Sequence, residues 1–163
     1  MRITSLTPIL IVDAIEPLLP FWFEAGLQQL MEVEEPNGLG FVGLGRDGAV
    51  TLMLQTKASL STDLPAVAAT HPATLLYADT DDLAAIEAAT AHDDLLVPRR
   101  TTFYGADEIW VRAANGTITG YAPPAAAPAA LPGGHPGRRS LRPREPHRRP
   151  PDADRLTRDH LGA

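Results

Sequence analysis

The chain has 163 residues, a formal net charge of −6 and no cysteine. This length suits one ordinary domain or two small modules that share a core, and the lack of cysteine excludes disulfides, thiolate metal sites and a cysteine nucleophile. No stretch is long and apolar enough to span a membrane, and the first residues lack the apolar region of a signal peptide, so we expect a cytoplasmic protein with no membrane partner.

Charge divides the chain into two parts. Residues 1–122 contain 6 Lys/Arg and 16 Asp/Glu, whereas residues 123–163 contain 8 Arg and 4 Asp/Glu. Because the acidic part lacks the clustered cations that neutralise phosphates, we expect no nucleic-acid partner. The second part also holds 9 of the 16 prolines and little apolar surface, so we predict that residues 123–163 form a disordered Pro/Arg-rich tail.

Residues 3–55 are predicted to form a βαβββ module. A capping box of Asp13 and Glu16 would open the helix, Pro20 would distort it or delay its start, and Gly26 would end it. An Asn-Gly pair and an Asp-Gly pair, which favour tight hairpins, separate the strands that follow. The predicted strands are residues 4–12, 28–34, 39–44 and 49–55.

A second module, at about residues 73–122, repeats this order after an aperiodic connector at 56–72. Thr80, Asp81 and Asp82 would cap its helix. The offset between the modules is about 68 positions, and it relates Asp13 to Asp81 and one hairpin turn to the other. A duplicated chain predicts a site shared by its halves. The expected elements are a helix at 82–90 and strands at 73–79, 95–99, 108–113 and 117–122.

These paired modules resemble the vicinal oxygen chelate superfamily, which includes glyoxalase I, bleomycin-resistance proteins and extradiol dioxygenases. The family's opening strand and helix are similar to residues 8–26 (PILIVDAIEPLLPFWFEAG), and its closing hairpin is similar to residues 104–122 (YGADEIWVRAANGTITGYA). The resemblance covers residues 3–122. It implies an α+β fold in which two βαβββ modules form one cupped pair of half-barrels around a ligand, and it implies a homodimer.

Metal-dependent members of that superfamily carry His and Glu ligands on the first and last strands of each module. Transferred to this chain, those positions carry no imidazole or carboxylate, and neither do their immediate neighbours. Two histidines of the first 122 residues, His71 and His92, fall outside these strands. We therefore expect no metal and no other cofactor. The transferred positions are Thr7, Leu52, Leu75 and Gly120, and their neighbours are Pro8, Met53, Thr74 and Thr119.

Aromatic and polar side chains of the predicted strands form a candidate binding site. Aromatic walls with an oriented polar group suit a flat or cationic small molecule. Glu108 would act as a base if burial raised its pKa, although an exposed carboxylate at a strand edge is the favoured interpretation. The candidate lining residues are Thr7, Gln55, Tyr77, Tyr104, Glu108 and Trp110.

Other conspicuous residues have simpler structural interpretations. Trp22 and Phe23 are predicted to pack in the core. The pair Arg99-Arg100 is predicted to lie on a solvated strand edge, where it would discourage strand pairing. Phe103 lies beside Tyr104 at a glycine turn and is equally compatible with a structural role and with a ligand wall.

The functional hypothesis is a metal-independent small-molecule binding protein of the glyoxalase/bleomycin-resistance type. It would sequester an aromatic or cationic compound, such as a drug or a metabolite, without transforming it, so we assign no catalytic residue. The alternative is a metal-dependent lyase or dioxygenase of the same superfamily whose ligands the alignment missed or another chain completes. A regulatory domain that works through protein partners is a third possibility.

Overall fold

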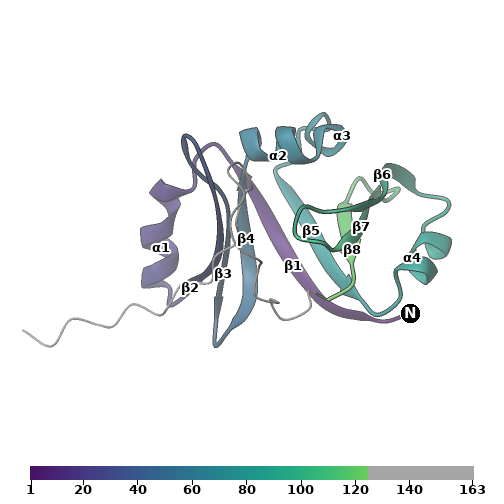
Figure 1. Ribbon diagram of the computed structural model, residues 1–163, viewed down its shortest axis with the longest axis horizontal. Helices are drawn as coiled ribbons and strands as arrows, with labels where there is room; N and C mark the ends of the chain where they lie inside the picture. Colours follow the sequence, from purple (N-terminus) through teal and green to yellow (C-terminus); the bar gives the residue numbers. More distant parts are fainter. Residues whose placement is uncertain (125–163) are drawn as a thin grey trace, which may run out of the picture.

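The computed structural model describes residues 1–124, so almost all of the predicted tail lies outside the described residues. Eight strands form one sheet in the order β2-β3-β4-β1-β5-β8-β7-β6. The fold is α+β, with two βαβββ modules that together form a cupped domain, as predicted (Figure 1). The strands are β1 (Ile3–Val12), β2 (Gln28–Glu35), β3 (Gly38–Arg46), β4 (Ala49–Thr56), β5 (Thr74–Thr80), β6 (Asp94–Thr101), β7 (Asp107–Arg112) and β8 (Ile118–Ala122).

The helices are short and lie around this sheet. In Figure 1, α1 and α4 lie at opposite ends of the sheet, while α2 and α3 cross above its middle. None of the helices in residues 1–124 combines the length and apolarity needed to cross a bilayer. They are the 3-10 helix η1 (Glu16–Leu18), α1 (Leu19–Glu24), α2 (Lys57–Asp63), α3 (Pro65–Ala68) and α4 (Leu83–Ala89).

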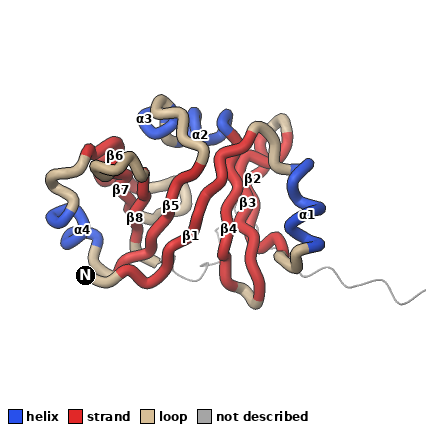
Figure 2. The backbone as a smooth tube through the Cα atoms, turned by 180° about the vertical axis from the view of Figure 1, so that it is seen from behind, coloured by secondary structure: helices blue, strands red, loops and turns tan. Residues whose placement is uncertain are grey.

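One pair of strands joins the two modules. β1 runs antiparallel to β5, with Thr7 opposite Tyr77 and Ile9 opposite Leu75. Each of these strands pairs on its other side with the last strand of its own module, β1 with β4 and β5 with β8, in parallel orientation. The tube view from behind shows β1 and β5 side by side in the centre of the sheet (Figure 2).

The two faces of the sheet carry different cores. On the outer face, α1 covers a cluster around Ile15, Val42 and Leu54, and α4 covers another around Ile86 and Ile109. On the inner face, both modules contribute to a third cluster, which comprises Ile9, Ile11, Leu60, Leu64, Val67, Leu75, Trp110 and Ile118.

The connector forms two helices, α2 and α3, although its sequence shows little periodicity. The Thr56 hydroxyl accepts a hydrogen bond from the Ser59 amide at 3.1 Å and so caps α2. Leu60, Leu64 and Val67 then project into the inner-face cluster. The helices form because this packing supplies the stabilisation that such short segments lack by themselves.

The capping prediction holds for the second module and fails for the first. The Asp82 carboxylate accepts from the Ala85 amide at 2.9 Å at the start of α4. In the first module Glu16 instead accepts from the Leu39 amide at 2.7 Å, and Asp13 pairs with Lys57. As predicted, the α-helix of the first module begins late, at Leu19, and stops just before Gly26, whose φ is +87°.

The aromatic residues of α1 were only partly predicted. Trp22 packs against the outer-face cluster under α1. Phe23, however, is 45% exposed, and Phe21 is 65% exposed. The prediction that Phe23 packs in the core is therefore wrong, because only one side of this two-turn helix contacts the sheet.

Candidate functional site

Four predicted positions lie in one row across the inner face of the sheet. Thr7 on β1 is in register with Tyr77 on β5. Tyr77 is in register with Gly120 on β8, and Gly120 with Trp110 on β7. Since residues in register point to the same face of a sheet, this row places Thr7 beside Tyr77 and brings both toward the Trp110 indole.

Glu108 lies two residues before Trp110 on β7, so its side chain points to the same face. Its side chain is 2% exposed, which contradicts the favoured interpretation as an exposed carboxylate. Its Oε1 accepts from Arg100 Nε at 2.8 Å and from Trp110 Nε1 at 3.0 Å. Its Oε2 accepts from the Tyr77 hydroxyl at 3.2 Å. The carboxylate is therefore buried, paired with a cation and held by three side chains.

Arg100 ties this carboxylate to the connector. Its Nη1 donates to the Asp63 carbonyl oxygen at 2.9 Å and its Nη2 to Asp63 Oδ1 at 3.2 Å, at the end of α2. The prediction of a solvated Arg pair is thus wrong for Arg100. It holds for Arg99, which forms a surface ion pair with Glu87. Alternation along β6 explains the difference, because neighbouring residues of a strand face opposite sides.

A chain of hydroxyl groups leads from Glu108 toward the surface. Because the Tyr77 hydroxyl donates to Glu108, the Tyr104 hydroxyl is the donor in the 3.4 Å contact between the two tyrosines. Burial, followed by the negative charges around it, raises the pKa of Tyr77 well above its usual value. Burial, followed by the charge of Glu108, also raises the pKa of Tyr104, although the residue as a whole is 42% exposed. Both phenols are therefore neutral donors at ordinary pH.

A tight loop between β6 and β7 positions Tyr104. The Thr102 hydroxyl accepts from the Ala106 amide at 3.0 Å, and Gly105 takes a φ of +88°, which favours glycine. Phe103 packs edge-on against Tyr104, with ring centroids 5.1 Å apart, and is 50% exposed. The loop thus presents two aromatic rings at the rim of the polar cluster.

Gln55 is the candidate residue that the structure does not bring to this cluster. It is buried on β4 and lies in register with Ile11 and Phe41. Ile11 is four residues beyond Thr7, a separation of about 13 Å along an extended strand. Gln55 therefore lies on the first module's part of the inner face. Tyr77, Tyr104, Glu108 and Trp110 form the cluster itself, and Thr7 lies at its edge.

The residues at the superfamily's metal-ligand positions do not fit a metal. The Trp110 ring fills the space beside Gly120, where an added Cβ would lie 2.6 Å from ring atom Cζ2. On β4, Leu52 belongs to the outer-face cluster, so Met53 is the residue that faces inward. Within residues 1–124 no group of three or more His, Asp or Glu side chains is arranged to hold an ion. An indole, a thioether and aliphatic side chains are not ligands for a hard divalent cation, and the single Thr7 hydroxyl does not supply the converging donors that such an ion needs.

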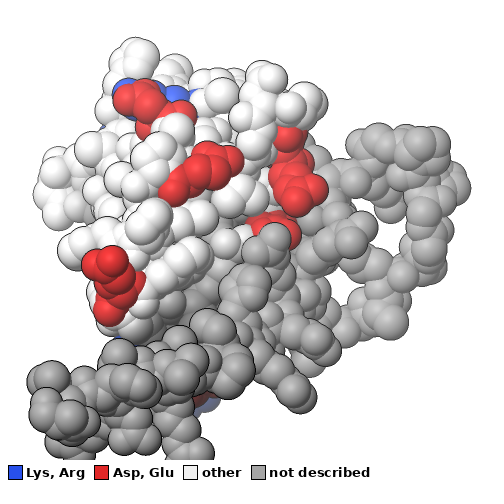
Figure 3. All heavy atoms as spheres, turned by 90° about the vertical axis from the view of Figure 1, so that its left-hand side faces the viewer, with Lys and Arg blue, Asp and Glu red and all other residues white. Residues whose placement is uncertain are grey.

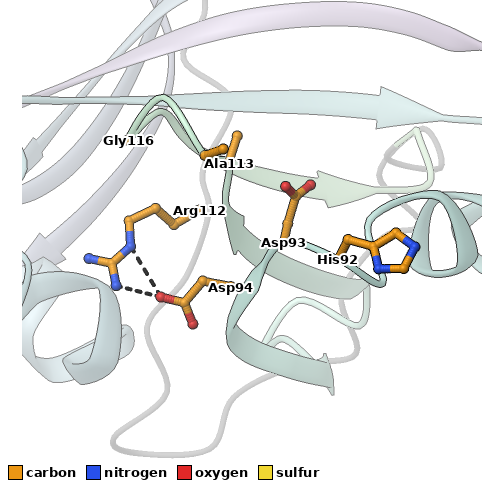
Figure 4. Close-up of a pocket in the computed structure, with 7 residues that line it drawn as sticks. His92, Asp93, Asp94, Arg112, Ala113 and Gly116 are labelled. Carbon is orange, nitrogen blue, oxygen red and sulfur yellow. Dashed lines mark hydrogen bonds and ion pairs between the residues drawn. The ribbon is translucent and has the colours of Figure 1, made fainter.

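Two hollows lie on the surface away from the cluster. One, of about 440 Å³, lies where Arg112 pairs with Asp94, beside Asp93 and His92 (Figure 4). The other, of about 590 Å³, lies between the connector helices and the end of β1, with Lys57 at its edge. Neither contains a residue of the Glu108 cluster.

Several solved structures share this architecture. A glyoxalase/bleomycin resistance protein/dioxygenase superfamily member from Vibrio splendidus 12B01 is 19% identical with a TM-score of 0.54, and the match covers 75% of this chain and 99% of that one. This chain has the glyoxalase/bleomycin resistance/dioxygenase superfamily fold. The resemblance inferred from the sequence is thereby confirmed for the fold.

Two further structures with this fold are a protein from Staphylococcus aureus and a hypothetical protein from Bacillus halodurans C-125. The first is 14% identical with a TM-score of 0.53 and covers 77% of this chain and 100% of its own. The second is 13% identical with a TM-score of 0.54 and covers 77% and 97%. No family profile and no curated protein matches the sequence.

Sequence reasoning missed Arg100 and Asp63 as parts of the cluster. Arg100 has a sequence signal, because side chains alternate between the two faces of a strand and Arg100 occupies an inward-facing position. In the structure it pairs in register with Glu108. Asp63 has none, since its place depends on the connector helices. The cluster therefore combines three strands that the sequence predicts, β5, β6 and β7, with a helix that it does not.

Proposed function

We propose that this protein binds a small molecule against the inner face of its sheet without a metal ion, and that it sequesters the molecule rather than transforming it. The observation that carries this proposal is the Trp110 ring beside Gly120. At a position where metal-dependent relatives would present a ligand, this chain places an aromatic wall.

The arrangement of Glu108 favours binding over catalysis. A general base must accept a proton from its substrate, and its lone pairs must face that substrate. Here Oε1 is engaged by Arg100 and Trp110, and Oε2 by Tyr77. The carboxylate is therefore a fixed acceptor that orients its donors, including the hydroxyl chain that ends at Tyr104.

The surroundings suit an aromatic or cationic compound. Arg100 is balanced by two carboxylates, Glu108 and Asp63, so these three groups carry a net charge of −1. Tyr104 and Phe103 present half-exposed rings next to them. Aromatic faces beside an excess of negative charge attract flat rings and cations.

The test is a thermal-shift screen of aromatic and cationic compounds against the purified full chain in the presence of a chelator, with metal analysis of the same sample. A ligand that binds only the native state raises the melting temperature, by an amount that grows with ligand concentration. We expect such a shift with chelator present, and we expect Tyr104→Ala to abolish it.

Leu95→Ala is the matched control, because Leu95 is 53% exposed on β6 and does not belong to the cluster. It should leave the shift unchanged. Stoichiometric metal that survives dialysis and is required for the shift would instead support a metal-dependent lyase or dioxygenase. A shift that Leu95→Ala removes and Tyr104→Ala preserves would place the ligand elsewhere and contradict the proposed site.

A further inference from the structure

The outer side of α1 is an apolar surface that the described residues leave open. Leu18 is 37% exposed, Phe21 65% and Phe23 45%. Phe21 contacts Trp22 edge-on, with ring centroids 4.9 Å apart. Because Phe21 and Phe23 are two residues apart on a helix, they lie on opposite flanks of α1 with Glu24 between them. We call these three residues, with Leu18, the α1 face.

Carboxylates are concentrated in the part of the first module that contains α1. Between residues 13 and 47 the chain holds seven Asp or Glu and one basic residue, Arg46. Five of these carboxylates belong to exposed residues, and the view onto this end of the molecule shows far more acidic than basic surface (Figure 3). The exposed acidic residues are Asp13, Glu16, Glu24, Glu34 and Asp47.

Several of the charged groups at this end of the molecule already have partners. Arg46 donates to the Gly26 carbonyl oxygen at the end of α1, and Lys57 pairs with Asp13 at 2.9 Å. Glu16 accepts a backbone amide, which also lowers its pKa and keeps it ionised. Glu24, Glu34 and Asp47 remain as exposed negative charges around exposed aromatic rings, a surface suited to arginine.

The chain itself carries a segment with the complementary chemistry. Residues 138–149 (RRSLRPREPHRR) contain six Arg and a single Glu. A guanidinium group can stack on a phenylalanine ring and pair with a carboxylate at the same time, which an ammonium group does less well. No function described above uses these arginines.

The segment is long enough to reach the α1 face. The described chain ends at Pro124, just after β8, and 13 residues, 125–137, precede the first arginine. At about 3.1 Å per residue these span about 40 Å when extended. β3 lies four strands from β8 in the sheet, which is about 19 Å, and the helix layer adds about 10 Å.

We propose that residues 138–149 of this same chain dock on the α1 face, with arginines stacked on Phe21 and Phe23 and paired with the surrounding carboxylates. The tail would then cover the largest exposed aromatic surface of the first module. The interaction is tethered, so it does not require high intrinsic affinity. It is independent of the ligand site in the second module.

Because the native chain has no cysteine, Ser140→Cys provides a single site for a nitroxide spin label in the full-length protein. We expect the label to broaden the amide NMR signals of α1 and to spare those of α4 at the opposite end of the sheet. Raising the salt from 0.1 M to 1 M shortens the Debye length from about 10 Å to about 3 Å and should restore most of the lost intensity.

Two sets of variants separate charge from aromatic contact. The broadening should be abolished, with residues 1–124 left unaltered, by serine substitutions at Arg138, Arg139, Arg142, Arg144, Arg148 and Arg149. Phe21→Ser with Phe23→Ser should also abolish it, whereas Leu95→Ser, which changes an equally exposed residue of the second module, should not.

Mixing labelled protein with unlabelled, isotope-enriched protein identifies the occupant. Broadening of α1 signals only within the labelled molecule supports the proposal. Transfer to the enriched partner would mean that a second copy's tail occupies the face, and would overturn the intramolecular contact. Broadening that spreads evenly over the surface, or none at all, would overturn it as well.

Discussion

The two modules have the same strand order but place different chemistry on the inner face. Ile9 of β1 is 68 positions before Tyr77 of β5; it pairs with Met53, which pairs with Gly43. In the second module Tyr77 pairs with Gly120, which pairs with Trp110. Each module thus places one glycine beside one large side chain. In the first module the glycine is on the third strand and the large side chain on the fourth, whereas in the second module the two are exchanged.

The exchange shows which features of the two modules stay alike and which differ. The hydrogen-bond ladders, turns and outer-face cores are shared, because the backbone depends on them. The inner face carries no such constraint beyond total volume, so the first module keeps a thioether and aliphatic side chains where the second has an indole, a phenol and a buried ion pair. The comparison can be tested residue by residue.

The largest effect is expected at the buried ion pair of the second module. Arg100→Ala leaves Glu108 buried without its cation, so the free energy of unfolding should fall by about 2–3 kcal/mol. This loss is smaller than for a fully buried pair, because Arg100 is partly exposed. Urea denaturation measures this. The matched variant Arg99→Ala removes only an exposed pair with Glu87 and should leave the urea midpoint almost unchanged. Equal losses for the two would contradict the assigned geometry.

Alanine substitution at the two glycines compares the exchanged positions directly. In Gly120→Ala the new Cβ would meet the Trp110 ring at 2.6 Å, and such overpacking costs about 1–3 kcal/mol. Gly43→Ala meets the flexible Met31 side chain, so it should cost less. Thermal denaturation ranks the variants. Trp110→Phe itself removes a donor to Glu108, so the two substitutions are compared in a double-mutant cycle. Gly120→Ala should cost less in the Trp110→Phe background, and an equal cost there would place the strain elsewhere.

The pH dependence of stability should also report on the second module. The pKa of Tyr77 is raised in the folded state, so its phenol stays protonated while the unfolded chain ionises above about pH 10. The unfolded state then binds fewer protons, and the free energy of unfolding should fall as pH rises beyond 10. Tyr77→Phe should make this fall shallower. Urea midpoints of both proteins, measured at increasing alkaline pH, test this, and an unchanged slope in the variant would show that Tyr77 is not the cause.

The smallest effect concerns the helix starts. Asp82→Ala removes the cap of α4 and should cost about 1 kcal/mol. Asp13→Ala, at the start of the first module's helical segment, removes only an exposed pair with Lys57 and should cost little. Urea midpoints compare the two. A larger loss at Asp13 would mean that the first helix is capped in solution after all.

The sequence predicts most of the fold because its signals are local. Alternating apolar residues and turn pairs mark the strands, and Asp47-Gly48, with φ of +53° and +79°, forms the expected tight hairpin. The connector helices escaped prediction because the inner-face cluster stabilises them, which is a tertiary effect. For the same reason, the aromatic residues of the candidate site could be inferred from β5, β7 and the loop before β7, whereas the ion pair between Arg100 and Asp63 could not.

The β1–β5 junction has a consequence for how quickly the chain folds. Its partners lie 64 positions apart at Leu10 and Thr74, and 77 apart at Ile3 and Thr80. The β3–β4 hairpin, by contrast, closes through two residues. Closing a long loop costs conformational entropy before the contacts at its ends can stabilise the chain. The hairpins should therefore form early and the β1–β5 junction late. Substitutions at the junction should then mainly accelerate unfolding, while those in a hairpin nucleus should slow refolding.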